Sequence, residues 1–213
     1  MIVAIDGPAG AGKSTVARAL ADRLGFRYLD TGAMYRALTW LAMKDGIDLS
    51  DGDRLGILAR EHPVDLDPSG RVSIAGADVT TSIRTGRIDK MVPVVARHPR
   101  VREVMRERQR RLAEQADSVM EGRDIGTVVV PDADVKVYLV ADAEVRAARR
   151  RAERPDVGDA ALETDLLRLN ERDRRDAERM KPAPDAIEID TTELEVEDVV
   201  DRIEALVRAR LAA

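Results

Sequence analysis

The sequence predicts an α/β fold in which helices connect the strands of a mostly parallel sheet. Short β-type runs alternate with helical stretches along the chain, which is typical of crossover connections between parallel strands. A glycine-rich turn follows the first strand-like run and precedes a helical stretch, an arrangement that favours phosphate binding. The length of 213 residues allows one full domain with at most a small satellite.

The first part of the chain predicts two strand–helix pairs. Gly25 and Gly46 follow the two helical stretches and are expected at their C-terminal ends. Asp30 or Thr31 is expected to cap the second helix. The predicted elements are a strand over residues 2–5, a helix over 13–24, a strand over 26–29 and a helix over 31–45.

The second part continues the alternation, and two stretches interrupt it. Residues 64–79 contain paired β-like runs, which predict a small antiparallel hairpin or meander inserted into the core. Residues 149–181 are dense in charge, and their pattern fits either a solvated helix pair or a mobile, arginine-bearing lid. The other predicted elements are strands over 119–121, 135–140 and 186–189, and helices near 143–154 and 196–210.

The composition narrows the class of protein. The formal net charge of −5 and an aromatic content of 2% argue against binding to nucleic acid polymers or to anionic membranes. The absence of cysteine excludes disulfides, thiolate metal sites and a cysteine nucleophile. No apolar run is long enough to cross a bilayer, and the first residues lack a basic signal-peptide region. We expect a soluble, cytoplasmic protein that acts as a monomer.

The glycine-rich turn carries a motif for binding triphosphates. Residues 7–14 read Gly-Pro-Ala-Gly-Ala-Gly-Lys-Ser and match the pattern G-x-x-x-x-G-K-[ST]. In such a loop, backbone N–H groups surround phosphate oxygens, Lys13 reaches the β- and γ-phosphates, and Ser14 holds Mg²⁺. The only asparagine, Asn170, lies in Asn-Glu-Arg-Asp, which does not match the N-K-x-D motif that reads guanine. We therefore expect a nucleoside triphosphate with Mg²⁺, and not a GTPase switch.

Beyond this loop, the sequence resembles the bacterial cytidylate kinase family over nearly its whole length. Five motifs carry the resemblance, and the first is Ile5-Asp6 together with the loop itself. The other four are Asp30-Thr31-Gly32-Ala33-Met34-Tyr35-Arg36, Ile83-Arg84-Thr85 with Pro99-Arg100-Val101-Arg102, Gly122-Arg123-Asp124-Ile125-Gly126-Thr127-Val128-Val129, and Glu171-Arg172-Asp173-Arg174-Arg175-Asp176 with Arg179.

The resemblance implies a P-loop nucleoside-monophosphate-kinase fold and phosphoryl transfer from ATP to CMP or dCMP. That fold has a mostly parallel five-stranded sheet with helices on both faces, a small inserted antiparallel sheet and a helical lid. The implied boundaries are a core over 1–61, 97–148 and 182–213, a monophosphate-binding insertion over about 62–96 and a lid over about 149–181.

The resemblance also implies roles for individual residues. Arginine suits this chemistry because its planar guanidinium binds phosphate bidentately and stays charged. Cytosine offers an amino donor with two acceptors, so a carboxylate and an arginine suit its recognition. The implied ATP-binding residues are Gly7, Pro8, Ala9, Gly10, Ala11, Gly12, Lys13, Ser14, Thr15 and Arg149. The implied catalytic residues are Lys13, Arg36, Arg123 and Arg179, and the implied CMP-binding residues are Thr31, Arg36, Arg84, Arg102, Arg123, Asp124, Arg172, Asp176 and Arg179.

Two departures from the family and two alternative functions stay open at this point. Pro93 replaces a serine that commonly touches the ribose, and the stretch after Arg179 is shorter than usual. The alternatives are a kinase for another small acceptor, such as UMP, AMP or shikimate, and an ATP-gated binding module without enzymatic activity.

The spacing of the last motif predicts one shared helical face. Arg172, Asp176 and Arg179 are spaced i, i+4, i+7, so a continuous helix would place them on one face, where Asp176 could bind the sugar.

Overall fold

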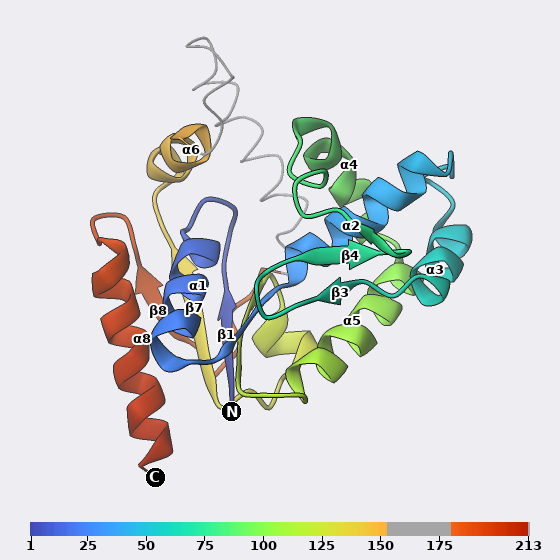
Figure 1. Cartoon of the computed structure of the whole chain (residues 1–213). Helices are drawn as coiled ribbons and strands as arrows, with labels where there is room; N and C mark the ends of the chain where they lie inside the picture. The colour runs from blue at the N-terminus through green and yellow to red at the C-terminus, as the bar shows by residue number, and fades with distance from the viewer. Residues whose placement is uncertain (153–179, 213) are drawn as a thin grey trace. The chain divides into compact units, whose positions relative to one another are not determined.

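The computed structural model describes residues 1–152 and 180–212, and the chain divides into two compact units (Figure 1). The first unit comprises Met1–Arg27 and Asp117–Ala213, and the second comprises Tyr28–Ala116. The boundaries of the inserted subdomain and of the lid stay predictions.

A parallel sheet forms the centre of the first unit. Its strands are β1 (Ile2–Asp6), β6 (Ser118–Gly122), β7 (Val135–Val140) and β8 (Ile187–Asp190), and β2 (Arg27–Asp30) completes one edge as the chain leaves the unit. The order is β2-β6-β1-β7-β8, and β1 pairs in parallel with both β6 and β7. This confirms the predicted mostly parallel, five-stranded sheet.

Helices α1 (Lys13–Leu24) and α8 (Val196–Leu211) pack against each other and against strands of this sheet (Figure 1). The predicted helix ends are confirmed for α1, because Gly25 adopts a left-handed φ of 67° after its last turn. A third helix, α6 (Ala143–Ala152), follows β7, and a short π-helix, η1 (Ile125–Val129), follows β6. Buried apolar side chains such as Ile5, Leu20, Met120 and Leu139 form the core.

Four helices build most of the second unit: α2 (Thr31–Lys44), α3 (Gly52–Glu61), α4 (Gly86–Ala96) and α5 (Pro99–Ala113). The Asp30 carboxylate caps α2 by accepting the Ala33 N–H at 2.8 Å, as predicted. Helix α2 packs against α4, and α3 packs against α5. Of these helices, α2 was predicted from the sequence, whereas α3, α4 and α5 were not.

A small antiparallel sheet also belongs to the second unit, and it confirms the predicted meander. Its strands are β3 (Asp65–Leu66), β4 (Val72–Ile74) and β5 (Ala77–Asp78), in that order. Ala75 and Gly76 turn the chain between β4 and β5 with φ values of 50° and 74°. Two consecutive positive φ values are typical of the tight turns that match the twist of a hairpin.

No helix in the part of the chain that the structure describes is both long enough and apolar enough to cross a membrane.

Candidate active site

The phosphate-binding loop joins β1 to α1 in the first unit, as the sequence predicts. Gly7, Gly10 and Gly12 have φ values of 145°, 81° and 86°, which side chains other than glycine rarely adopt. Gly12 directly precedes α1, so the loop leads into the positive end of the helix dipole. The observed backbone therefore has the form that cradles phosphate.

Close packing restricts the loop in addition to its dihedral angles. A Cβ atom on Gly10 would lie 2.6 Å from the carbonyl oxygen of Arg146 in α6. The Arg146 side chain is buried and donates from Nη1 to the Ala9 carbonyl at 3.1 Å. Helix α6 is thus attached to the phosphate loop, and the sequence analysis did not identify Arg146.

The Lys13 ammonium lies over the loop, where it donates to the Pro8 carbonyl at 2.7 Å. Lys13 is largely buried, whereas the next two residues, Ser14 and Thr15, are exposed. A phosphate group entering the loop would meet the buried ammonium as an opposite charge. Contact of Lys13 with the β- and γ-phosphates stays a prediction.

The residues at the loop fit a magnesium ion that arrives with a nucleotide. Ser14 offers an exposed hydroxyl oxygen at the start of α1, and Mg²⁺ prefers oxygen ligands. Within residues 1–152 and 180–212, no group of three or more His, Cys, Asp or Glu side chains could hold a metal. The remaining ligands would be phosphate and water oxygens, as is usual for Mg²⁺ in nucleotide sites.

Arg149, predicted to bind ATP, is anchored behind the same loop. Its guanidinium donates to the Thr191 hydroxyl at 3.0 Å and to the Thr191 carbonyl at 2.6 Å. The Thr191 hydroxyl lies 3.2 Å from the Ala11 carbonyl of the loop. Thr191 is a buried polar residue that the sequence analysis missed, because only the fold brings it to the loop.

Arg123 and Asp124 follow β6, and Arg123 reaches the phosphate loop of the same unit. Nη1 of Arg123 donates to the Gly7 carbonyl at 2.6 Å. Asp124 is 7% exposed and precedes η1. Of the two residues predicted to contact CMP, Arg123 is therefore bonded to the loop predicted to hold ATP, and Asp124 is its neighbour in the chain.

In the second unit, two of the predicted arginines share an acidic partner. Arg84 donates to Asp30 at 2.8 Å, and a nitrogen of Arg36 lies 4.0 Å from the other oxygen of the same carboxylate. Nε of Arg36 also donates to Asp89 of α4 at 3.1 Å. Asp30 was predicted only as a helix cap, and Asp89 was not identified.

Gly32 makes room for this arrangement. A Cβ atom at position 32 would lie 3.0 Å from Nη1 of Arg36 and 3.2 Å from Oδ1 of Asp30. The Arg36 guanidinium therefore folds back over the first turn of α2, toward the helix N-terminus. The motif residues Asp30, Gly32 and Arg36 thus pack together at the start of α2.

Two further residues predicted for the acceptor site lie on helices of the second unit. Thr31 is buried at the start of α2, and Arg102 is half-buried on α5. Pro93 lies inside α4, one turn after Asp89, and has no N–H to donate to the Asp89 carbonyl. Arg172, Asp176 and Arg179 lie outside the described residues, so their roles stay predictions.

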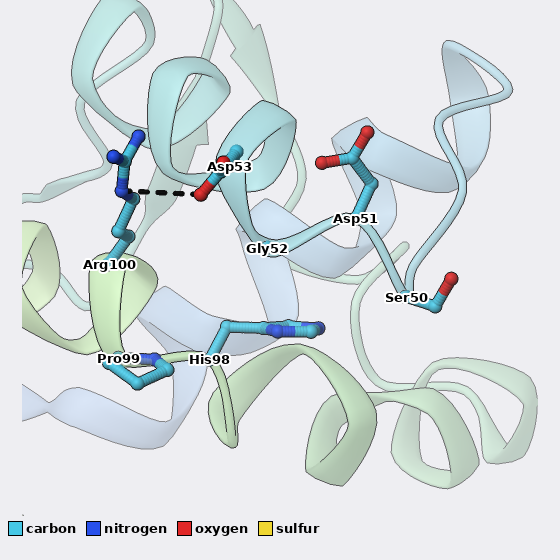
Figure 2. Close-up of a pocket in the computed structure, with 7 residues that line it drawn as sticks. All are labelled: Ser50, Asp51, Gly52, Asp53, His98, Pro99 and Arg100. Carbon is cyan, nitrogen blue, oxygen red and sulfur yellow. Dashed lines mark ion pairs between the residues drawn. The ribbon is translucent and has the colours of Figure 1, made fainter.

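A pocket of about 360 Å³ in the second unit involves none of the predicted site residues (Figure 2). Figure 2 shows Arg100 paired with Asp53 and the His98 ring beside Gly52. His98 bonds through Nε2 to the Leu49 carbonyl at 2.9 Å, and Asp51 caps α3. These side chains join the starts of α3 and α5, so we interpret the pocket as a packing junction. It is lined by Ser50, Asp51, Gly52, Asp53, His98, Pro99 and Arg100.

Comparisons with known proteins agree with the sequence motifs. The family described as "Cytidylate kinase" matches residues 3–209. The chain is 50% identical to the cytidylate kinase of Geobacillus kaustophilus, with 98% of this chain and 97% of the relative covered. It is 44% identical to the cytidylate kinase of Bacillus subtilis, with 94% and 93% covered.

A solved structure supports the fold. Shikimate kinase from Bacteroides thetaiotaomicron superposes with a TM-score of 0.53 at 16% identity, covering 98% of both chains. This likeness concerns the kinase fold alone. From the family match over residues 3–209 and the identity to its members, the chain belongs to the cytidylate kinase family.

Proposed function

We propose that this protein transfers the γ-phosphoryl group of ATP to the phosphate of CMP or dCMP, giving CDP or dCDP. Beyond family membership, one observation carries the proposal. Arg123 is bonded to Gly7 of the phosphate loop, and the buried carboxylate Asp124 is the next residue in the chain. The arginine that we propose binds phosphate is thus attached to the loop predicted to bind ATP, and the carboxylate that we propose binds cytosine follows it directly.

On the ATP side, backbone N–H groups of the loop bind the β- and γ-phosphates, and Lys13 adds positive charge. Phosphoryl transfer depends mainly on positioning and on neutralising charge as the bond to the leaving oxygen breaks. Lys13 is held at the loop by the Pro8 carbonyl and can exchange this partner for a phosphate oxygen. Ser14 would hold the Mg²⁺ that arrives with ATP, and the ion would supply further positive charge to the phosphate oxygens.

On the acceptor side, arginine side chains bind the CMP phosphate. Arg36 and Arg123 supply the guanidinium groups, and Arg179 is proposed to join them. Asp89 and Asp30 lie against Arg36 and restrict its rotation, so less side-chain entropy is lost when phosphate binds. The in-line attack then depends on how these arginines orient the acceptor oxygen.

Cytosine recognition rests on Asp124, Arg102 and Thr31, supported by Arg84. The Asp124 carboxylate accepts the cytosine amino group, and Arg102 donates to the ring acceptors. Uracil presents an oxygen where cytosine has its amino group, so a carboxylate would repel it. Arg172 and Asp176 are proposed to contact the phosphate and the sugar.

The substitution Asp124→Asn tests this assignment. The amide retains the size of the side chain and loses its charge, so kcat/KM for CMP should fall by about 10- to 150-fold. KM for ATP should change by less than about threefold. Because the amide can donate to uracil, the preference for CMP over UMP should shrink. An equal effect on ATP and CMP would assign Asp124 a structural role instead.

A further inference from the structure

Asp6 is a buried carboxylate that the proposed reaction does not use directly. It ends β1, directly before the phosphate loop, and is 6% exposed. Oδ1 accepts the N–H of Ile125 and Oδ2 accepts the N–H of Gly126, each at 2.8 Å. Both carboxylate oxygens therefore hold the start of η1.

Gly7, the residue after Asp6, holds the same segment through Arg123, which precedes Asp124. The Gly7 carbonyl accepts from Nη1 of Arg123 at 2.6 Å. Asp6 and Gly7, which are consecutive, thus bind the residues on both sides of Asp124. We call this pair of contacts the Asp6–Gly7 clamp.

The clamp is suited to orienting side chains. The first N–H groups of a helix have no partner within the helix, and a carboxylate satisfies two of them here. Short π-helices are frequent at functional sites. An amide or a hydroxyl at position 6 could not accept both N–H groups with two equivalent oxygens.

We propose that Asp6 is a positioning residue for acceptor recognition: its bonds to Ile125 and Gly126 fix Arg123 and Asp124 in place relative to the phosphate loop. The inference rests on the proposed function, since it assigns CMP recognition to Asp124. It predicts that damage to the clamp weakens CMP binding and base selectivity more than ATP binding.

Asp6→Asn is the direct test. The variant keeps the side-chain size, but its NH₂ group would oppose a backbone N–H. We expect KM for CMP to rise about 10-fold or more, since a charged acceptor is lost. KM for ATP should rise by less than about threefold, and the ratio of kcat/KM for CMP to that for UMP should fall.

Asp134→Asn is the matched control. Asp134 accepts the N–H of Ile2 at 2.7 Å, so it is a carboxylate bonded to the backbone at the other end of β1. This variant should leave KM for both substrates unchanged. A rise in KM for CMP in the control comparable to that in D6N would overturn the specific role of Asp6.

The outcomes separate this inference from the proposed function. Absence of CMP phosphorylation by the wild-type protein would refute the function. If the wild-type protein is active, two results for D6N would refute only the clamp. These are unchanged kinetics, and equal rises in KM for CMP and KM for ATP. Should D6N not fold, amide hydrogen exchange of the wild-type protein decides. The amides of Ile125 and Gly126 should exchange about 100-fold or more slowly than free peptide, and unprotected amides would contradict the clamp.

Discussion

The burial of Asp6 predicts a specific pH dependence of stability. Burial raises the pKa of Asp6 from its ordinary value of 3.8 to about 6, although the bonds from Gly126 and Ile125 oppose the rise. The nearby Asp124 carboxylate raises the pKa further, and the Lys13 ammonium lowers it. A further charged side chain, Lys136 of β7, lies near Gly126, to which Asp6 is bonded. The Lys136 ammonium is paired with Asp185.

The sign of the effect follows from proton linkage. The folded protein holds the Asp6 proton to a higher pH than the unfolded chain does, so this group favours folding at low pH. Its contribution to the free energy of unfolding decreases as the pH rises from about 4 through about 6. At about 1.4 kcal/mol for each pH unit of pKa difference, the decrease between about pH 4 and about pH 7.5 is about 2 to 3 kcal/mol.

Urea unfolding of the wild-type protein and D6N measures this effect. Other carboxyl groups titrate over the same range, but those that do not interact with Asp6 cancel in the difference between the two proteins. The free energy of unfolding of the wild type minus that of D6N should fall by about 2 to 3 kcal/mol from about pH 4 to about pH 7.5. A difference that stays constant, or grows with pH, would refute the argument from burial.

Three further predictions follow from the site and its supports. Lys13→Ala should lower kcat by about 100-fold or more while the circular dichroism spectrum stays unchanged, and near-normal turnover in the folded variant would defeat the assignment. Asp89→Asn should raise KM for CMP by about 3- to 10-fold and leave KM for ATP unchanged in steady-state assays, because Arg36 loses a charged partner. An unaltered KM for CMP would show that Asp89 has no role in CMP binding. Gly52→Ala should lower the free energy of unfolding by about 1–3 kcal/mol, since its Cβ atom would lie 2.6 Å from Nδ1 of His98; urea unfolding with no loss of stability would contradict the packing junction.

Elements that depend on local chemistry could be predicted from the sequence. The phosphate loop and α1 follow from glycines that permit positive φ and from the residue at the helix end, Gly25. The cap of α2 follows from Asp30, whose carboxylate bonds three residues ahead. The strands of the parallel sheet were predictable because short apolar runs were bounded by turns and helices.

Elements that depend on tertiary packing could not be predicted in this way. Helix α4 contains Pro93 in its interior, which is unfavourable in an isolated helix and is tolerated where α2 packs against it. Helix α5 is rich in charge, so its apolar face is only a sparse pattern in the sequence. The π-helix η1 has no periodic signal of its own.

The same division applies to the candidate site. Arg36 and Arg123 stood in recognisable motifs, whereas Asp89 is 53 residues away from its partner Arg36 in sequence. Asp6 belongs to the first motif, but its bonds to residues 119 and 120 positions later are created by the pairing of β1 with β6. Long-range partners of this kind carry no local pattern.

Phosphorylation of cytidine monophosphates can be tested with a panel of acceptors. ADP release would be measured with ATP and magnesium in the presence of CMP, dCMP, UMP, AMP or shikimate, and without any acceptor. We expect steady turnover with CMP and dCMP, and kcat/KM values about 100-fold or more lower with UMP and AMP. Turnover that is highest with AMP or shikimate, or ADP release that does not depend on an acceptor, would contradict the account.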